Sequence, residues 1–273
     1  MQQVAVKQVV VKQARQTIRN RVAFMEKVPP IYAPVIGILG LLVLWEALAR
    51  MGVFKPDYLP APTLILSAGW EMLLSGEIYT NLVASLIRIG AGFAIGASVG
   101  IIIGLVLGFF RWLDALFTPV VYSLYPIPKI ALLPLLILWL GIGETPKLVI
   151  IALGVFYPVV LNTHAGVKNV DRSLIKAAVT FGAKPFNIIR KVILPASLPT
   201  IFAGLKMAAG YSMLLMITAE MIAAEKGIGA MIMHYGNMLM TTNLMVGVII
   251  LSMLGLLINR SLEWIERKVL PWK

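Results

Sequence analysis

Long apolar runs constrain this chain more than any other feature of its sequence. A helix needs about 20 residues to cross the hydrocarbon layer of a membrane. Six runs approach or exceed this length, at residues 31–49, 82–110, 116–140, 147–163, 201–224 and 244–258. The chain is 59% hydrophobic and 13% charged, whereas soluble domains are about half apolar and about a quarter charged. The sequence therefore predicts an all-α integral membrane protein with six transmembrane helices.

The basic residues predict how the chain is oriented in the membrane. The formal net charge is +12, from 24 Lys and Arg against 12 Asp and Glu. If the N-terminus is cytoplasmic, seventeen basic residues fall on the inner side and four on the outer side, as the positive-inside rule requires. Both termini are then cytoplasmic, and the charge needs no nucleic-acid partner. Residues 1–30 form a basic segment, either a surface helix or a solvated tail, before a membrane domain at 31–273.

The connection at residues 166–200 is too polar to cross the membrane, yet it has the signals of folded structure. Asp171 can cap the start of a short helix, and Gly182 stands where a left-handed residue would end it. Pro185 suits the first turn of a second helix, and Pro195 is predicted to end it. Both helices have an apolar face, which either the membrane surface or another protein must cover.

Charged residues inside the apolar runs are candidates for function because they are costly there. Lys129 falls near the middle of the third run, among Pro126, Pro128 and Pro134. Prolines at this depth break a helix, which is tolerated where the backbone is buried in protein or lines a cavity. Lys129 either lines such a cavity or pairs with an acid on another span. Arg88 lies nearer a span end and is expected to extend its side chain towards the interface.

Several strings in this sequence resemble one known family. One set consists of Lys176, Ala177 and Ala178, then Gly182, and then residues 192–195 (Val-Ile-Leu-Pro). This set resembles the EAA motif of the permease subunits of ATP-binding-cassette (ABC) importers. Lys176 stands in the place of the motif's glutamate, and Val192 stands in the place of its isoleucine. Further strings resemble the nitrate/sulfonate/taurine branch of these permeases. They are residues 59–62, 84–88, 125–128, 133–135, 141–144, 219–220 and 227–229. The resemblance covers residues 59–271.

This resemblance implies the fold, the partners and the coupling residues. The fold would be that of a type I ABC importer permease in the bacterial inner membrane. The chain would pair with a second copy of itself, two cytoplasmic ATPases and an extracytoplasmic substrate-binding protein. ATP and Mg would be bound by the ATPase, since the chain has no phosphate-binding loop and is not itself an enzyme. The residues predicted to contact the ATPase are Arg172, Lys176, Ala177, Ala178, Gly182 and Phe186.

The third and fifth runs are predicted to line a translocation pathway for a small anionic solute such as a sulfonate, taurine or nitrate. The candidate pathway residues are Tyr125, Lys129, Ser212, Met213, Met216 and Glu220. An ion-gradient-driven carrier is the alternative, although its usual inverted repeat is missing. A membrane-embedded enzyme or a metal site is not favoured, because the chain has no cysteine and only two histidines. The identity of the solute is left open, since in this family specificity rests mainly on the binding protein.

Overall fold

The structure is a computed structural model that describes residues 32–55 and 57–272, and every regular element in this part of the chain is helical. The predicted basic segment at 1–30 lies outside the described residues. The chain divides into two compact units after Leu64. The elements are α2 (Ala33–Arg50), α3 (Pro62–Leu74), α4 (Glu77–Phe109), α5 (Arg111–Leu124), η1 (Lys129–Leu132), α6 (Leu133–Leu140), α7 (Glu144–Lys168), α8 (Arg172–Thr180), α9 (Pro185–Ile188), η2 (Ile189–Ile193), α10 (Leu194–Ala223), α11 (Ile228–Asn237) and α12 (Thr241–Val269).

In the first unit, a glutamate near the end of α2 holds the start of α3. The Glu46 carboxylate accepts hydrogen bonds from the Thr63 backbone N–H at 3.1 Å and from the Thr63 hydroxyl at 2.8 Å. The Arg50 guanidinium, one turn further along α2, donates to the same carboxylate at 2.5 Å. A negative charge at a helix N-terminus satisfies free backbone N–H groups and complements the helix dipole. Glu46 therefore acts as the cap of α3.

The second unit contains the helices that are long and apolar enough to span a membrane. Among the described residues these are α4, α7, α12 and the continuous helical stretch Pro185–Ala223. The third predicted run is two helices, Arg111–Leu124 and Lys129–Leu140, which meet at 88°. The predicted count of six spans is not confirmed, because the described part shows four such helices, or five if the bent pair is one span. The break follows from Pro126 and Pro128, which cannot donate backbone hydrogen bonds.

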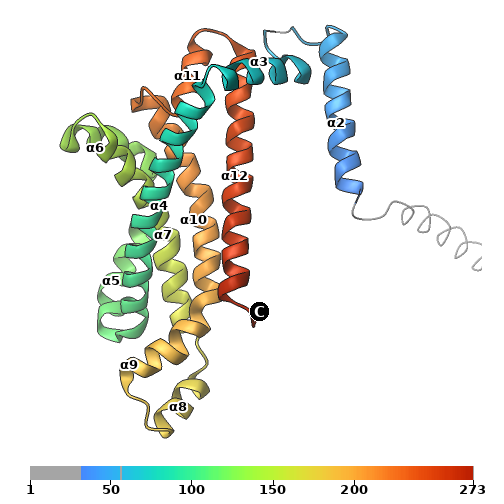
Figure 1. Cartoon of the computed structure of the whole chain (residues 1–273). Helices are drawn as coiled ribbons and strands as arrows, with labels where there is room; N and C mark the ends of the chain where they lie inside the picture. The colour runs from blue at the N-terminus through green and yellow to red at the C-terminus, as the bar shows by residue number, and fades with distance from the viewer. Residues whose placement is uncertain (1–31, 56, 273) are drawn as a thin grey trace, which may run out of the picture. The chain divides into compact units, whose positions relative to one another are not determined.

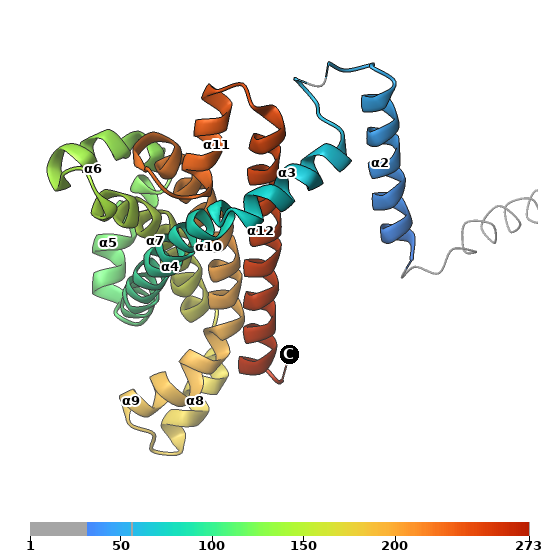
Figure 2. The same cartoon turned by 45° about the horizontal axis from the view of Figure 1, so that its top comes forward.

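Helices α4 and α7 pack closely along their length (Figures 1 and 2). The contact uses a stripe of glycines on α4, one every fourth residue, which places them on one face of the helix. The glycines are Gly92, Gly96, Gly100, Gly104 and Gly108, and the α7 residues that face them are Ile151, Val155, Val159, Thr163 and Val167. Because glycine has no side chain, the two backbones can approach closely. We call these ten residues the glycine seam.

The connection between α7 and α10 is shorter than the sequence predicts. Helix α7 runs to Lys168, and the helix that begins at Pro185 continues without interruption to Ala223. The prediction that Pro195 ends a helix is therefore wrong. A π-helical turn, η2, lies just before Pro195 and supplies the wider backbone spacing that a proline ring needs inside a helix. Helices α8 and α9 lie at the opposite end of this unit from α11 (Figure 1).

Candidate functional site

The loop at the end of the bundle forms as its capping residues predict. The Asp171 carboxylate accepts the Ser173 backbone N–H at 2.8 Å, and α8 then runs from Arg172 to Thr180. Gly182 follows the helix with φ of +75°, a left-handed conformation that suits glycine. Pro185 is the first residue of α9. The predicted N-cap, the C-terminal glycine and the proline at the start of the second helix are all confirmed.

The apolar side chains of this loop fall into two groups. Ile175 and Ala178 pack against a small core at the end of α7 and α9. The others project away from the chain: Phe181 is 90% exposed and Phe186 is 70% exposed, while Leu174 and Val179 are more than half exposed. We call Leu174, Val179, Phe181 and Phe186 the loop patch. Aromatic and aliphatic side chains that are this exposed on one short loop are typical of a protein interface.

The predicted coupling residues lie on the same loop as this loop patch. Arg172, Lys176, Ala177 and Gly182 are exposed, Phe186 belongs to the patch, and Ala178 is half-buried. In the part of the chain that the structure describes, Lys176 forms no ion pair.

The Asp171 cap gives a testable effect of pH. The Ser173 backbone N–H holds the pKa of this carboxyl below its ordinary value. Because the folded-state pKa is lowered, the stabilisation of α8 is complete above the unfolded pKa and is lost as the pH falls through the folded pKa. We expect Asp171→Ala to cause the same loss at neutral pH, seen as several-fold faster amide exchange in the first turn of α8. Equal exchange in the variant and the parent would contradict this cap.

The break between α5 and η1 places the Lys129 amine at a cluster of backbone carbonyls and tyrosine rings. The ammonium donates to the carbonyl oxygen of Leu124 at 3.1 Å and to that of Tyr125. It also lies 4.2 Å from the ring centre of Tyr157 and 5.3 Å from that of Tyr125. No carboxylate in the described residues is within ion-pair distance of it. Of the two sequence interpretations, the structure supports the cavity, because Lys129 lines one of about 350 Å³.

The six candidate pathway residues do not gather in one place. Tyr125 lines the cavity with Lys129. Ser212 is fully buried, donates to the Ala209 carbonyl at 2.8 Å, and borders a different, apolar cavity of about 570 Å³ beside α4 and α12. Met216 is fully buried in the core, and Met213 packs against the same core. Glu220 belongs to a polar network described next. The assignment of these six residues to a pathway stays a prediction.

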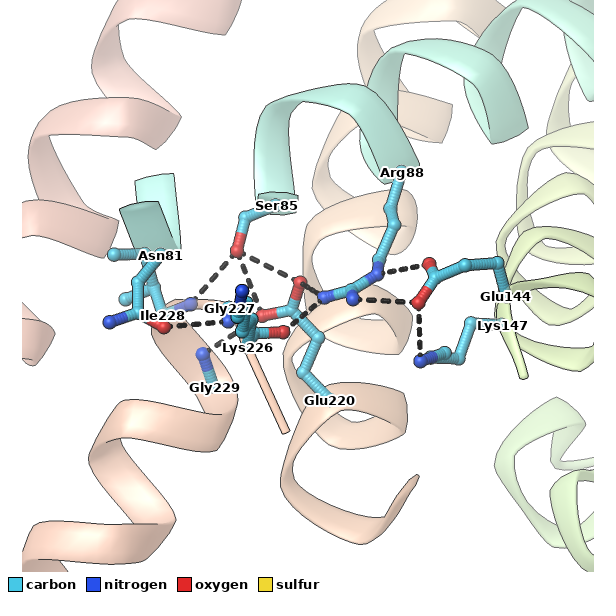
Figure 3. Close-up of polar contacts among 10 residues, drawn as sticks. All are labelled: Asn81, Ser85, Arg88, Glu144, Lys147, Glu220, Lys226, Gly227, Ile228 and Gly229. Carbon is cyan, nitrogen blue, oxygen red and sulfur yellow. Dashed lines mark hydrogen bonds and ion pairs between the residues drawn. The ribbon is translucent and has the colours of Figure 1, made fainter. Parts of the chain in front are cut away.

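A largely buried network of charged groups ties α4, α7, α10 and α11 together, and it was not predicted from the sequence (Figure 3). Arg88 is 6% exposed, so the expectation that it reaches the interface is wrong. Its guanidinium donates to Glu220 at 2.7 Å and to Glu144 at 2.5 and 2.9 Å. Lys147 adds a contact to Glu144 at 2.8 Å. Two cations therefore balance two carboxylates, which offsets the desolvation of the three buried members, Arg88, Lys147 and Glu220, while Glu144 is 56% exposed.

Glu220 is the centre of this network and is fully buried. Its carboxylate accepts from the Ser85 hydroxyl at 2.8 and 2.9 Å and from the Gly229 backbone N–H at 2.9 Å, in addition to Arg88. Gly227, with φ of +133°, lies so close to this carboxylate that an added Cβ would come within 2.5 Å of its oxygens. The bonds of Glu220 therefore fold the short connection from α10 to α11 onto α4.

Four of the strings that carry the family resemblance meet at this network. Residues 84–88 supply Ser85 and Arg88, residues 141–144 supply Glu144, and residues 219–220 supply Glu220, while residues 227–229 supply the backbone N–H of Gly229. The sequence feature that could have indicated this network is the presence of an arginine and two glutamates in or beside the apolar runs. Their pairing could not be read from one sequence because the partners are separated by many tens of residues.

The two histidines are not brought together at a metal site. His164 lies in α7, and its Nε2 is 2.7 Å from Asp114 of α5, which also pairs with Lys168 at 2.5 Å. These contacts join α5 to the end of α7. In the described part of the chain, no group of three or more His, Cys, Asp or Glu side chains could hold a metal ion.

Comparison with known proteins gives consistent matches over most of the chain. Residues 96–271 match the family described as binding-protein-dependent transport system inner membrane component. The chain is 35% identical over 233 residues to the putative aliphatic sulfonates transport permease protein SsuC of Bacillus subtilis (strain 168), with 85% of this chain and 84% of that protein covered. It is 33% identical over 243 residues to the taurine transport system permease protein TauC of Escherichia coli (strain K12), with 87% and 88% covered.

The fold also matches a solved structure. A chain of the MetNI methionine ABC transporter, in an inward-facing conformation, superimposes with a TM-score of 0.55 and 23% sequence identity. The match covers 77% of this chain and 98% of that chain. At this identity the likeness shows a shared fold, which confirms the fold class predicted from the sequence.

Proposed function

The chain belongs to the family of binding-protein-dependent transport system inner membrane components, the permeases of ABC importers, and from this premise we propose that it carries a small sulfonate into the cell. The family is the one predicted from the motifs. The proposed solute class rests on the two relatives, which are described as permeases for aliphatic sulfonates and for taurine. Taurine is itself an aminosulfonate, so both descriptions share one oxyanion group.

The proposed partners are a second copy of the chain, two cytoplasmic ATPases and an extracytoplasmic binding protein that delivers the solute. The loop patch is the observation that carries the ATPase assignment. It exposes two phenylalanines, Phe181 and Phe186, on a folded loop at one end of the bundle. Lys168, Arg172 and Lys176 lie in or beside the same loop, and by the positive-inside rule these basic residues support a cytoplasmic position for it. Both termini are proposed to be cytoplasmic as well.

Within this proposal, ATP and Mg bind to the ATPase and this chain transmits the movement. Helix α8 is joined to α7 by three residues, and α9 is continuous with α10 through the π-helical turn. A displacement of the loop patch would therefore move two spanning helices together. The solute pathway is proposed to involve Tyr125, Lys129, Ser212, Met213, Met216 and Glu220, from the third and fifth runs of the sequence.

The proposal is tested by reconstitution. The chain, its proposed partner ATPase and its proposed binding protein are assembled in liposomes, and uptake of radiolabelled ethanesulfonate is measured with and without ATP. We expect uptake that requires both ATP and the ATPase. Uptake driven by a proton or sodium gradient without ATP would instead identify an ion-driven carrier. Failure of the chain to recover an ATPase during purification would count against the coupling assignment.

Phe186→Ala is expected to weaken binding of the chain to the ATPase. Large aromatic side chains at the centre of an interface commonly contribute ~2 kcal/mol or more to binding, which is about a thirty-fold loss of affinity on truncation. The measurement is recovery of the ATPase with the purified variant, together with ATP-driven uptake. Tyr79→Ala is the matched control, because Tyr79 is 69% exposed but lies in the first turn of α4 and so outside the loop that carries the loop patch. Equal losses in the two variants would exclude a specific role for the loop patch.

A further inference from the structure

The cavity beside the break in the third run has the composition of a receptor for an anion. It has a volume of about 350 Å³, within the range of ~300–1,000 Å³ typical of small-molecule sites. Residues from three helical segments line it, since Tyr125 directly follows α5, Tyr157 lies in α7 and Tyr211 lies in α10. Most of the remaining lining is apolar. Lys129 is the charged side chain in this lining.

In the part of the chain that the structure describes, no carboxylate pairs with the Lys129 ammonium, which is held here by uncharged groups. Pro128 lacks the N–H that would otherwise bond to the Leu124 carbonyl four residues earlier. That carbonyl accepts only a long bond from the Ile127 N–H, at 3.4 Å, so carbonyl groups at this end of α5 keep acceptor capacity. The ammonium donates to two of them, those of Leu124 and Tyr125. Carbonyl dipoles and tyrosine ring faces attract a cation, but they do not neutralise it. A cation in an apolar setting therefore remains poised to pair with an anion that enters the cavity.

We propose that this cavity binds the sulfonate group of the solute during its passage, with Lys129 as the pairing cation. The inference rests on the proposed function, and it adds the place and the chemistry of recognition. A sulfonate has three oxygens and a single negative charge, so it can accept from the ammonium and from tyrosine hydroxyls together. Tyr125 and Tyr211 both line the cavity, and the hydroxyl of either can turn towards such an oxygen.

Tyr157 acts as a positioning residue for the ammonium. Its ring centre is 4.2 Å from the Lys129 nitrogen, closer than the ring of Tyr125. A ring face at this distance attracts the cation without offering a lone pair that would compete with the solute. The ammonium therefore stays in place in the cavity and can still form an ion pair with an anion that enters. Because that ion pair is the solute's own and is not fixed in the protein, the anion can leave again. Loss of the ring should therefore weaken binding, whereas loss of the hydroxyl alone should not.

The test measures anion binding by the chain assembled with its ATPase in nanodiscs, without the binding protein. The probe is 2,2,2-trifluoroethanesulfonate, followed by broadening of its ¹⁹F resonance, and the uncharged comparison is 2,2,2-trifluoroethanesulfonamide. We expect Lys129→Gln to weaken sulfonate binding by roughly ten-fold or more, which is the usual loss for a hydrogen bond to a charged group. Binding of the sulfonamide should not change. Lys129→Arg should retain sulfonate binding, Tyr157→Phe should resemble the parent, and Tyr157→Leu should weaken binding.

Lys268→Gln is the matched control, because Lys268 also lies over an aromatic ring, that of Trp264 at 3.8 Å, but outside the cavity. Equal sulfonate binding by Lys129→Gln and the parent would overturn the inference. The inference would also be overturned if Lys129→Gln lowered only the thermal stability of the chain, since that result would make Lys129 only a cap for α5. The proposed function fails separately, if the unaltered importer shows no ATP-driven ethanesulfonate uptake. Uptake by the parent with no effect of Lys129→Gln would reject the cavity alone.

Discussion

Gly96→Val is expected to destabilise the packed form of the second unit strongly. A Cβ at this position would lie 2.8 Å from the Cβ of Val155 and closer still to the backbone carbonyl of Ala152. A side chain could move away, but a helix carbonyl cannot move without displacing α7 itself. Forcing atoms into a packed core costs ~1–3 kcal/mol and more where the backbone must shift, so we expect a loss of about 3 kcal/mol or more. The measurement is thermal unfolding and size-exclusion behaviour of the purified variant in detergent.

Other glycines of α4 provide a graded control. Gly90→Val should leave stability almost unchanged, because an added Cβ there meets nothing within 4 Å. Gly100→Ala should fall between the two, since its Cβ would lie 3.0 Å from the Phe156 carbonyl and from Val159. A stability order that did not follow Gly90, Gly100, Gly96 would contradict the glycine seam as the contact that sets the distance between α4 and α7.

The glycine seam was visible in the sequence but was not predicted. From Gly92 to Gly108 the second apolar run has a glycine at every fourth position, and such spacing places small residues on one helix face. Hydropathy identifies the run as a span without indicating which face packs on which partner. The facing residues on α7, from Ile151 to Val167, lie almost sixty positions further on, and nothing local to either run pairs the two stripes.

Local backbone signals were predicted most accurately. Asp171 as an N-cap and Gly182 as a left-handed residue each depend on a few neighbouring positions, and both are confirmed. The prediction for Pro195 failed because a proline can be accommodated inside a helix when a π-helical turn precedes it. That accommodation depends on packing at Ile188 and Ile193, which are buried at the end of the bundle. Local chemistry alone therefore predicted a helix end where tertiary contacts carry the helix through.

The charged residues of the apolar runs also show that local sequence does not predict tertiary contacts. Arg88 was expected to extend to the interface because, taken alone, an arginine near a span end usually does. Its partners Glu144 and Glu220 come from two other helices. Lys129 was placed correctly at a break, since the neighbouring prolines are local to it. The ring of Tyr157 that it meets could not be predicted, because that contact requires the packing of α7 against the break.

Arg88→Met is expected to be the most damaging single change in the polar network. Removing one member of a buried ion pair leaves the other charge without compensation and costs ~3–5 kcal/mol. Here the change strips Glu220, which is fully buried, of its cation, and leaves only the Ser85 hydroxyl and the Gly229 N–H to hold it. Thermal unfolding of the purified chain in detergent measures the loss. Arg260→Met is the control, since its pair with Glu263 is exposed and should contribute ~1 kcal/mol or less.

A second substitution distinguishes electrostatics from lost packing. Glu220→Gln keeps an oxygen that can accept from Ser85 and Gly229 but removes the negative charge. The double variant Arg88→Met with Glu220→Gln should therefore be more stable than Arg88→Met alone, by ~0.5–3 kcal/mol for residues in direct contact. Simple addition of the two single losses would show that Arg88 contributes mainly through packing. A recovery would instead show that the buried carboxylate of Glu220, which folds the connection between α10 and α11 onto α4, requires a cation at its side.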